Sequence, residues 1–539
     1  MVEFNHKNKN VEWKDGFFMN QTQLVTVVAL IIFALAMVLI GVYSSKKTKT
    51  LDGFLLGSRN IGAWVSAFAY GTSYFSAVVF VGYAGQHGWN IGLGSIWIGI
   101  GNAVLGCLLA WQLLAARTRT MTHTLQSKTM PEFFESRYDC TALKVFAAVI
   151  IFVFLVPYSA AVYKGLGSMF STIFPEVSNN VWMLIIAVLT ACYLVLGGYV
   201  ATAYTDFVQG IIMIVGVIAM IFAIVNTEAV GGFTNMMDNL RAIPNNGDGI
   251  DGSQITSWYG GSSIKFLCVN IMLTSFGTWG LPQMVNKYYA IKDVKSIKQA
   301  KYISTAFAII IGCGAYFVGS LSRLILNNKL PEGGVDSVIP TTLLTALGDP
   351  NILTTIILAV ILILLLSASM STLSSIVLSS ASAISVDFYP AIKKDYNPKN
   401  QMVLTRVLCL TFVALSYIFA TTNITIIVNI MSFSWGIVSG CFIGPYVWGI
   451  YSKKVTKAGA WAGMLCGFLT VVVTTIVLTA INTADAGTVG AAFKIAAKKA
   501  PEMGCAAMAV SLVVVPVVSM FTKKFDNNFI AKVFAVNEE

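Results

Sequence analysis

Apolar residues follow one another along this chain in long runs, and polar or charged residues are confined to the short segments between them. A helix needs about 20 apolar residues to cross the hydrocarbon core of a bilayer. Runs of about that length predict an all-α integral membrane protein with about thirteen membrane-spanning helices. The predicted spans are roughly residues 21–45, 59–86, 91–116, 142–172, 180–197, 204–228, 263–289, 300–326, 352–386, 402–421, 425–451, 457–481 and 502–521.

Lysine and arginine cluster in every second connection between these runs. Short loops rich in these residues stay in the cytoplasm. Such loops follow the first, third, seventh, ninth, eleventh and last runs, and the one after the seventh run, residues 287–301, begins with Lys287. The opposite connections are polar, acidic or rich in glycine. The alternation predicts a multi-pass protein of the cell membrane with its N-terminus outside and its C-terminus in the cytoplasm.

The composition excludes several classes of protein. Of the 539 residues, 56% are hydrophobic and 11% are charged, whereas soluble globular proteins carry about 25% charged residues. The net charge of +11 forms no single patch, so nucleic acid is not an expected partner. The nine cysteines and three histidines show no metal-ligand spacing. With no nucleophile–base pair or phosphate-binding loop either, we expect neither an enzyme nor a cofactor.

Two of the predicted helices contain residues that break helices. The second run contains GTSYFSAVVFVG from Gly71, and the seventh contains FGTWGLPQ at residues 276–283. Proline and glycine disfavour a continuous helix, and unwound backbone at membrane depth is tolerated where it is buried in protein or lines a cavity. The alternative is that these small residues only allow close helix packing.

The breaks lie five spans apart, so the two broken helices run in opposite directions, as in an inverted repeat with a transport site between its halves. This predicts repeats at residues 58–228 and 229–451. The remaining parts are an outer segment at 1–20, a first helix with its basic loop at 21–57, two peripheral helices at 452–521 and a short cytoplasmic tail at 522–539.

Hydroxyl groups share one face of the ninth run. Ala368, Ser371 and Thr372 stand at i, i+3 and i+4, and such positions meet on one helical face. Two hydroxyls and the carbonyls of an unwound helix can bind a hard monovalent cation. The alternative is that the hydroxyls bond to carbonyls of their own helix or join neighbouring helices. Asp206, at the start of the sixth run, is either functional or a helix cap.

The motifs LLGSRNIGAWVSAFAYGTSYFSAVVFVG, TMPEFFESRY, GGYVATAYTDFVQ, GLPQMVNKYYAIKD and SASMSTLSS resemble those of the sodium:solute symporter family. This family contains sodium-coupled carriers of proline, pantothenate, monocarboxylates, sialic acid and sugars. The resemblance covers roughly residues 20 to 480. It implies a LeuT-like fold with a five-plus-five inverted repeat, here preceded by one helix and followed by two.

The resemblance also implies a principal sodium site. Its ligands are the backbone carbonyls of Thr72, Phe75 and Ala368 and the hydroxyls of Ser371 and Thr372. Asp206 matches an acidic residue beneath that site, which assists sodium entry or release or helps to bind a second sodium. Arg59 matches a cytoplasmic basic position of the proline carriers.

A mostly apolar solute pocket with a few polar anchors is expected from Ser73, Tyr74, Ser76, Trp97, Tyr158, Thr278 and Trp279. The sugar carriers have polar side chains where this chain has Val79 and Gly99, and the proline carriers place an aspartate at the position of Tyr74. We therefore expect a carboxylate, vitamin or amino-acid-like solute rather than a hexose.

Taken together, the sequence predicts sodium-coupled symport of a small organic solute by alternating access, with sodium as a co-transported ion and the bilayer as surroundings. A monomer suffices for such transport. A proton-coupled or uncoupled carrier of the same fold is the near alternative. A membrane sensor is the alternative from another class, but the tail after Thr522 is short for a signalling domain.

Overall fold

The computed structural model describes residues 21–45, 51–348, 351–393, 398–422 and 424–535. These residues form helices joined by turns, and within them the only β pairing is a single bridge between Ile61 and Ile291. The all-α prediction is confirmed. The predicted outer segment 1–20, the basic residues 46–49 and the end of the tail lie outside the described residues.

The long helices are α1 (Gln21–Ser45), α8 (Thr141–Ile173), α9 (Asn179–Val225), α12 (Ile264–Gly280), α14 (Val294–Ala308), α18 (Ile352–Ser382), α20 (Pro398–Ala420), α21 (Ile427–Tyr451), α22 (Lys457–Ala486) and α24 (Ala500–Met520). The short helices are α2 (Leu51–Leu56), α3 (Ala63–Tyr74), α4 (Ala84–Ile91), α5 (Ile96–Gly101), α6 (Ala116–Thr124), α7 (Met130–Tyr138), α10 (Gly232–Arg241), α11 (Gly252–Ile255), α13 (Pro282–Ala290), α15 (Gly314–Ser320), α16 (Ser322–Ile325), α17 (Val338–Ala346), α19 (Tyr389–Ile392), α23 (Val489–Ala497) and α25 (Asn527–Val533). Wider π-helical turns continue several of them, at Val78–Tyr83, Asn102–Leu109, Trp111–Ala115, Ile309–Cys313 and Ala383–Phe388.

Ten helices of the described residues are long and apolar enough to cross a membrane, or eleven when the bent pair formed by α12 and α13 is included. Ten of the thirteen predicted runs correspond to these helices. The other three are residues 59–86, which are interrupted after α3, residues 180–197, where the apolar helix Asn179–Cys192 is short, and residues 263–289, which form the bent pair.

Local backbone geometry explains each of these three differences. Phe75, after α3, has extended dihedrals of φ −101° and ψ 111°. Leu281, between α12 and α13, has φ −82° and ψ 124°, and the two helices meet there at 49°. Gly198 has φ 57° and ψ −159° inside α9, a conformation that is readily available only to glycine. The breaks predicted in the second and seventh runs are therefore present.

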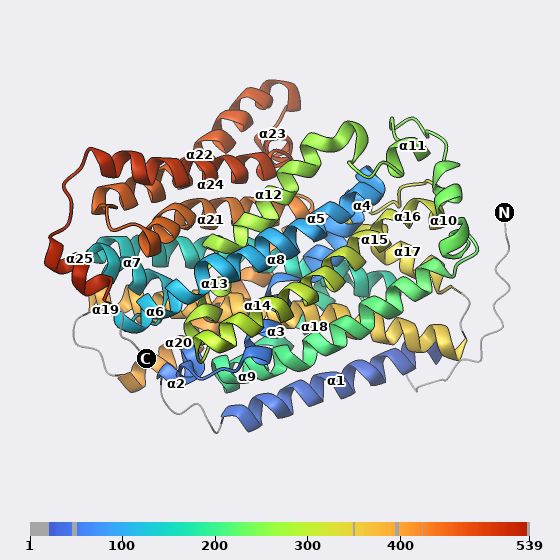
Figure 1. Cartoon of the computed structure of the whole chain (residues 1–539). Helices are drawn as coiled ribbons and strands as arrows, with labels where there is room; N and C mark the ends of the chain where they lie inside the picture. The colour runs from blue at the N-terminus through green and yellow to red at the C-terminus, as the bar shows by residue number, and fades with distance from the viewer. Residues whose placement is uncertain (1–20, 46–50, 349–350, 394–397, 423, 536–539) are drawn as a thin grey trace.

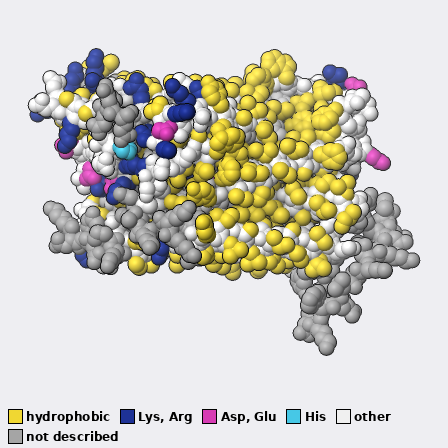
Figure 2. All heavy atoms as spheres, turned by 60° about the horizontal axis from the view of Figure 1, so that its bottom comes forward, with side chains coloured by type: hydrophobic (Ala, Val, Ile, Leu, Met, Phe, Trp, Pro, Cys, Tyr) yellow, Lys and Arg dark blue, Asp and Glu magenta, His cyan; other side chains and the backbone are white. Residues whose placement is uncertain are grey.

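The long helices run side by side along one direction, with α10, α11, α16 and α17 at one end of the bundle and α6, α7, α19 and α25 at the other (Figure 1). Figure 2 shows a broad apolar band between two polar ends, with Lys and Arg side chains gathered at one of them. We call this the basic end; α6, α7 and α25 lie there. An exposed apolar band of this extent is typical of a surface that faces lipid.

Two helices form the centre of the bundle. The side chains of α18 are buried from Ile361 to Ser382 except at Ile363, and most of α21 is buried as well. Helix α18 packs against α3, α8, α9 and α1, and α21 packs against α12 and α24. This arrangement brings the hydroxyl-rich middle of α18 to the break that follows α3.

Candidate ion and solute site

Hydroxyl groups accept hydrogen bonds from the unwound backbone after α3. Helix α3 ends at Tyr74, and the backbone N–H of Ala77 donates to Ser369 Oγ of α18 at 3.1 Å. The N–H of Val78 donates to Ser76 Oγ at 3.2 Å. Backbone groups that lose their helical partners need such replacements when they are buried. The hydroxyls of the motif and of α18 thus stabilise the unwound segment.

Four of the five residues predicted to bind sodium meet at this break. Ser371 Oγ donates to the carbonyl oxygen of Thr72 at 2.9 Å and to that of Ala368 at 3.0 Å. Thr372 Oγ1 lies 3.2 Å from the oxygen of Thr72 and 3.1 Å from that of Ala368. Phe75, the fifth residue, lies in the extended segment three positions after Thr72. Two hydroxyl and two carbonyl oxygens so close together form a donor set suited to a hard cation.

A second polar group lies beside the first. Ser73 Oγ and Ser375 Oγ are 2.8 Å apart, and Lys287 Nζ donates to Ser375 Oγ at 3.1 Å. The same ammonium lies 3.5 Å from Asp206 Oδ2 and 5.2 Å from the centre of the Tyr199 ring. The two charged side chains, 2% and 0% exposed, are fully enclosed.

The placement of Lys287 corrects the sequence analysis, which assigned it to a cytoplasmic loop. Helix α13 continues to Ala290, and its end is drawn into the bundle by paired backbone bonds. Ile61 N donates to the oxygen of Ala290 at 3.1 Å, and Lys292 N donates to the oxygen of Ile61 at 3.0 Å. Asp206 lies inside α9, eight positions after Gly198, and no described backbone N–H donates to its carboxylate. The capping role considered for Asp206 is therefore not observed.

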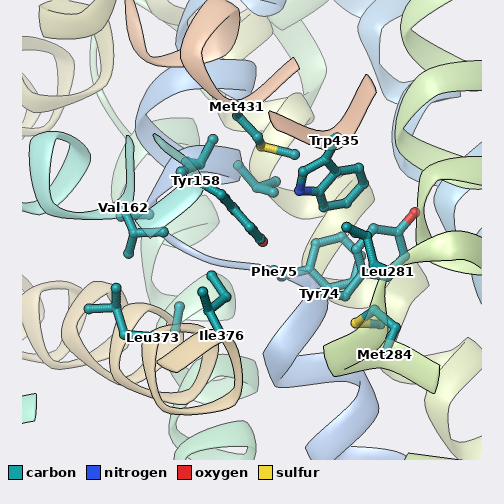
Figure 3. Close-up of a cluster of buried hydrophobic side chains, with 14 of the residues drawn as sticks. Tyr74, Phe75, Tyr158, Val162, Leu281, Met284, Leu373, Ile376, Met431 and Trp435 are labelled. Carbon is teal, nitrogen blue, oxygen red and sulfur yellow. The ribbon is translucent and has the colours of Figure 1, made fainter. Parts of the chain in front are cut away.

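Aromatic side chains gather at the two breaks. The Tyr74 ring stacks on Trp435 of α21 with 6.2 Å between ring centres, and the edge of Tyr158 meets Trp435 at 5.7 Å. Leu281, from the second break, lies beside Tyr74, and the Trp435 nitrogen is on the side of Tyr158 (Figure 3). Tyr74 Oη donates to the carbonyl oxygen of Thr274 at 2.7 Å, which fixes the ring between the two broken helices.

The other residues predicted to line the solute pocket are dispersed. The Ser73 hydroxyl faces α18, and Ser76 caps the break. Thr278 Oγ1 and Trp279 Nε1 donate to carbonyls of the segment Asn102–Leu109, at 3.2 and 3.0 Å. Trp97 is 39% exposed, and its ring contacts Trp258 in the loop before α12. The structure therefore does not bring Trp97 to the breaks.

Three polar side chains at the second break were not singled out from the sequence. Gln283 is 1% exposed, and its amide nitrogen and oxygen have no hydrogen-bond partner among the described residues. The same holds for Trp435 Nε1 and Ser439 Oγ on α21. Buried polar groups are normally paired, so these atoms are candidates for contact with a ligand. The position of Gln283 directly after Pro282 was a signal that the sequence offered.

Glycines bring α12 close to α21 at this break. A Cβ on Gly277 would lie 2.5 Å from the Trp435 ring, and a Cβ on Gly280 would lie 2.5 Å from Ser439 Oγ. Distances this short exclude a side chain. The two glycines of FGTWGLPQ are thus required for the close contact between α12 and α21.

At the basic end, Arg59 is anchored away from both breaks. Its Nη2 donates to the carbonyl oxygen of Ser127 at 2.7 Å. Ser127 precedes α7, which is formed by the motif TMPEFFESRY. Thr129 Oγ1 accepts from Glu132 N at 3.2 Å, and Glu132 Oε2 accepts from Lys128 N at 2.6 Å. The Thr129 cap and the bond from Lys128 N–H to Glu132 thus fix the start of α7.

At the opposite end, an ion pair ties the loop between α10 and α11 to the helix that follows the first break. Arg323 Nη2 donates to Asp248 Oδ2 at 2.7 Å, and its Nε donates to the oxygen of Trp89 at 2.7 Å. Burial opposes ionisation of Asp248, but bonds from Arg323 and the Ile250 N–H more than offset it and hold the pKa of that carboxyl below its usual value.

Comparisons with known proteins concern the family and the fold of this chain. A sequence profile of the sodium:solute symporter family matches residues 54–467. The high-affinity proline transporter PutP of Bacillus subtilis is 29% identical, with 81% of this chain and 89% of that protein covered. A sodium/proline symporter of Haemophilus influenzae is also 29% identical, over 83% and 87% of the two chains. A sodium/proline symporter of Escherichia coli is 27% identical over the same shares.

Among solved structures, a Na⁺-coupled sialic acid symporter in a substrate-bound, outward-open state superimposes with a TM-score of 0.70. The alignment covers 93% of this chain and 99% of that one at 18% identity. At this identity the likeness concerns the fold alone. It shows that the helices are arranged as in a LeuT-like transporter.

Proposed function

The chain belongs to the sodium:solute symporter family, and on that basis we propose that it carries proline or a closely related small amino acid together with sodium. Sodium-coupled symport of a small organic solute follows from the family. The observation that supports the narrower solute is the likeness to proline carriers over more than four fifths of the chain. The sequence alone indicates the wider class of carboxylates, vitamins and amino-acid-like solutes.

The proposed sodium site is formed by the carbonyl oxygens of Thr72, Phe75 and Ala368 and the hydroxyls of Ser371 and Thr372. The contacts of the two hydroxyls with Thr72 and Ala368, at 2.9 to 3.2 Å, support it. Sodium is then the link between α3 and α18. An ion that joins these helices stabilises one arrangement of the break over others, which is what coupling to the solute requires.

The proposed solute site is lined by Tyr74, Tyr158 and Trp435, whose rings contact one another. A pyrrolidine ring packs well against aromatic side chains, and the buried Gln283 amide and Trp435 Nε1 supply polar contacts. A carboxylate is further favoured by the N-terminal ends of the half-helices that begin after the two breaks, because those ends carry partial positive charge. Ser76, Thr278 and Trp279 act around this site by fixing the backbone.

The proposed topology has thirteen membrane crossings. The three crossings beyond the ten long helices are the two broken helices and the segment of α9 before Gly198. The two broken helices have their breaks at Phe75 and Leu281. Each is the first helix of a predicted repeat, which supports the five-plus-five arrangement. The basic end in Figure 2 supports a cytoplasmic location for that end, with the N-terminus outside and Arg59 on the cytoplasmic side. The unit of transport in this proposal is a monomer in the cell membrane.

Competition for labelled proline on the purified protein in sodium tests the solute. Unlabelled proline and its small analogues should displace the label, whereas a hexose, pantothenate and a monocarboxylate should not. Trp435→Ala, a variant of the proposed site, should weaken proline binding while the purified protein stays monodisperse. Displacement of the label by a monocarboxylate at a lower concentration than by unlabelled proline would replace the proposed solute with that class.

A further inference from the structure

A hydroxyl row leads from the proposed sodium site toward the basic end of the bundle. Ser371, Ser375, Ser379 and Ser382 stand at successive spacings of four, four and three on α18, so they share one face. Ser371 is fully buried, whereas Ser375, Ser379 and Ser382 keep 5%, 6% and 3% of their surface exposed. Helix α18 continues past this row to α19 at the basic end (Figure 1). The row therefore places a line of buried hydroxyl groups between the site and the basic end, and we call this line the route.

Asp206 lies beside the same route. Gly210, one helical turn later on α9, packs against the sodium site, since a Cβ there would be 3.0 Å from Thr72 Cγ2. The part of α9 after Gly198 runs from the basic end toward α10 at the other end. Four residues of helix span about 6 Å, so Asp206 is about one turn closer to the basic end than the level of Thr72.

The Lys287 side chain contacts this hydroxyl row. Its ammonium donates to Ser375 Oγ, the step directly after Ser371 in the hydroxyl row, at 3.1 Å. It is also 3.5 Å from the Asp206 carboxylate. From the same helix, Asn286 Nδ2 lies 3.4 Å from Ser379 Oγ, the following step. Two adjacent side chains of α13 thus contact two consecutive steps of the row.

We propose that the Lys287 ammonium is a tethered cation that competes with sodium for Asp206 and Ser375. This inference rests on the proposed sodium site. A buried carboxylate is stabilised by one nearby cation, and a second cation at the same oxygens adds repulsion in a medium of low dielectric. Sodium that leaves Thr72 and Ser371 toward the basic end must displace Lys287. Once the ion has gone, Lys287 returns to Asp206 and disfavours rebinding.

The competition predicts that loss of the Lys287 charge strengthens sodium binding. Replacing Lys287 by methionine removes the competitor and keeps the length of the side chain, so the variant should bind sodium more tightly. Residues in contact are coupled to an extent that corresponds to roughly a two-fold to hundred-fold change. A purely structural ion pair predicts the opposite, because loss of Lys287 would loosen the helices around the site. Asp206→Asn should bind sodium more weakly.

The experiment measures the sodium concentration that half-saturates binding of labelled proline to the purified protein. Lys287→Met should lower this concentration at least about two-fold, and in an Asp206→Asn background the same substitution should change it by less. Lys301→Met is the matched control, since Lys301 Nζ bonds to Gln112 on the exposed surface at 2.7 Å. If Lys287→Met is not recovered as a monodisperse protein, Lys287→Gln removes the charge and can still donate to Ser375.

Unchanged or weaker sodium affinity in both Lys287→Met and Lys287→Gln would overturn the inference. An equal gain in the Asp206→Asn background would also overturn it, because the competition is for that carboxylate. These results are distinct from a failure of the proposed function. In that case the unmodified protein itself would show no sodium dependence of proline binding.

Discussion

Removal of the two hydroxyls at the proposed sodium site is the substitution that bears most directly on the ion. Ser371→Ala and Thr372→Ala should each fold, because the hydroxyl that remains still donates to the carbonyl oxygens of Thr72 and Ala368. Each variant nevertheless lacks one oxygen ligand. A buried site offers the ion little replacement by water, so sodium affinity should fall in both.

The size of the effect follows from the contacts. A hydrogen bond to a charged group contributes about 1.5–3 kcal/mol, and we take a hydroxyl–sodium contact to be of similar strength. At about 1.4 kcal/mol per tenfold change in affinity, each substitution should weaken sodium binding roughly ten-fold to a hundred-fold. The double variant should lose sodium-dependent solute binding over the accessible range of sodium concentration.

The assay is the half-saturating sodium concentration for binding of labelled solute, with expression and monodispersity checked for each protein. Ser374→Ala is the matched control, since Ser374 is equally buried and its hydroxyl donates to the Ser371 carbonyl of its own helix at 2.9 Å. It should leave the sodium dependence unchanged. Wild-type sodium affinity in both Ser371→Ala and Thr372→Ala would refute the ligand assignment.

Three further predictions concern other parts of the molecule. Asp206→Asn should slow sodium-driven uptake far more than it lowers expression, because amide and carboxylate have the same size but only the carboxylate attracts the ion; uptake at the normal rate would contradict this. The lowered pKa of Asp248 means that its ion pair with Arg323 contributes fully above about pH 4 and is lost as the pH falls through the folded value. Proteolysis of the loop between α10 and α11 should therefore increase as the pH falls through the folded pKa of Asp248, and Asp248→Asn should show no such increase relative to its own cleavage at neutral pH. A Cβ on Gly88 of α4 would lie 2.1 Å from the backbone of α15, so Gly88→Ala should lower the free energy of unfolding by about 1–3 kcal/mol. Gly62→Ala, where a Cβ meets open space, is the control. Equal thermal stability of the two variants would argue against the close contact between α4 and α15.

Much of the fold could be predicted because lipid imposes a simple pattern on the sequence. Apolar runs located the spanning helices, and the Gly and Pro residues near Phe75 and Leu281 located both breaks. The hydroxyl face of α18 could be derived from helical spacing alone. The pairing of that face with Thr72 required the resemblance to the family, because spacing within one helix says nothing about its neighbour.

The charged part of the site could not be predicted in the same way. Lys287 appears in the sequence as the first of several lysines in a basic loop, and only the pairing of Ile61 with Ala290 and Lys292 shows that it is enclosed. Trp435 lies in an apolar run without any distinguishing neighbour. Its role beside Tyr74 and Tyr158 depends on contacts between distant helices, which a single sequence does not record.

Transport by the purified protein in sealed vesicles tests the central claim most directly. With labelled proline outside, an inward sodium gradient should drive accumulation above the outside concentration, and potassium or choline gradients should not. Because coupling is reciprocal, an inward proline gradient should in turn drive uptake of labelled sodium, and Ser371→Ala should reduce both fluxes. Equal proline accumulation under sodium, potassium and choline gradients would contradict sodium-coupled symport by this protein.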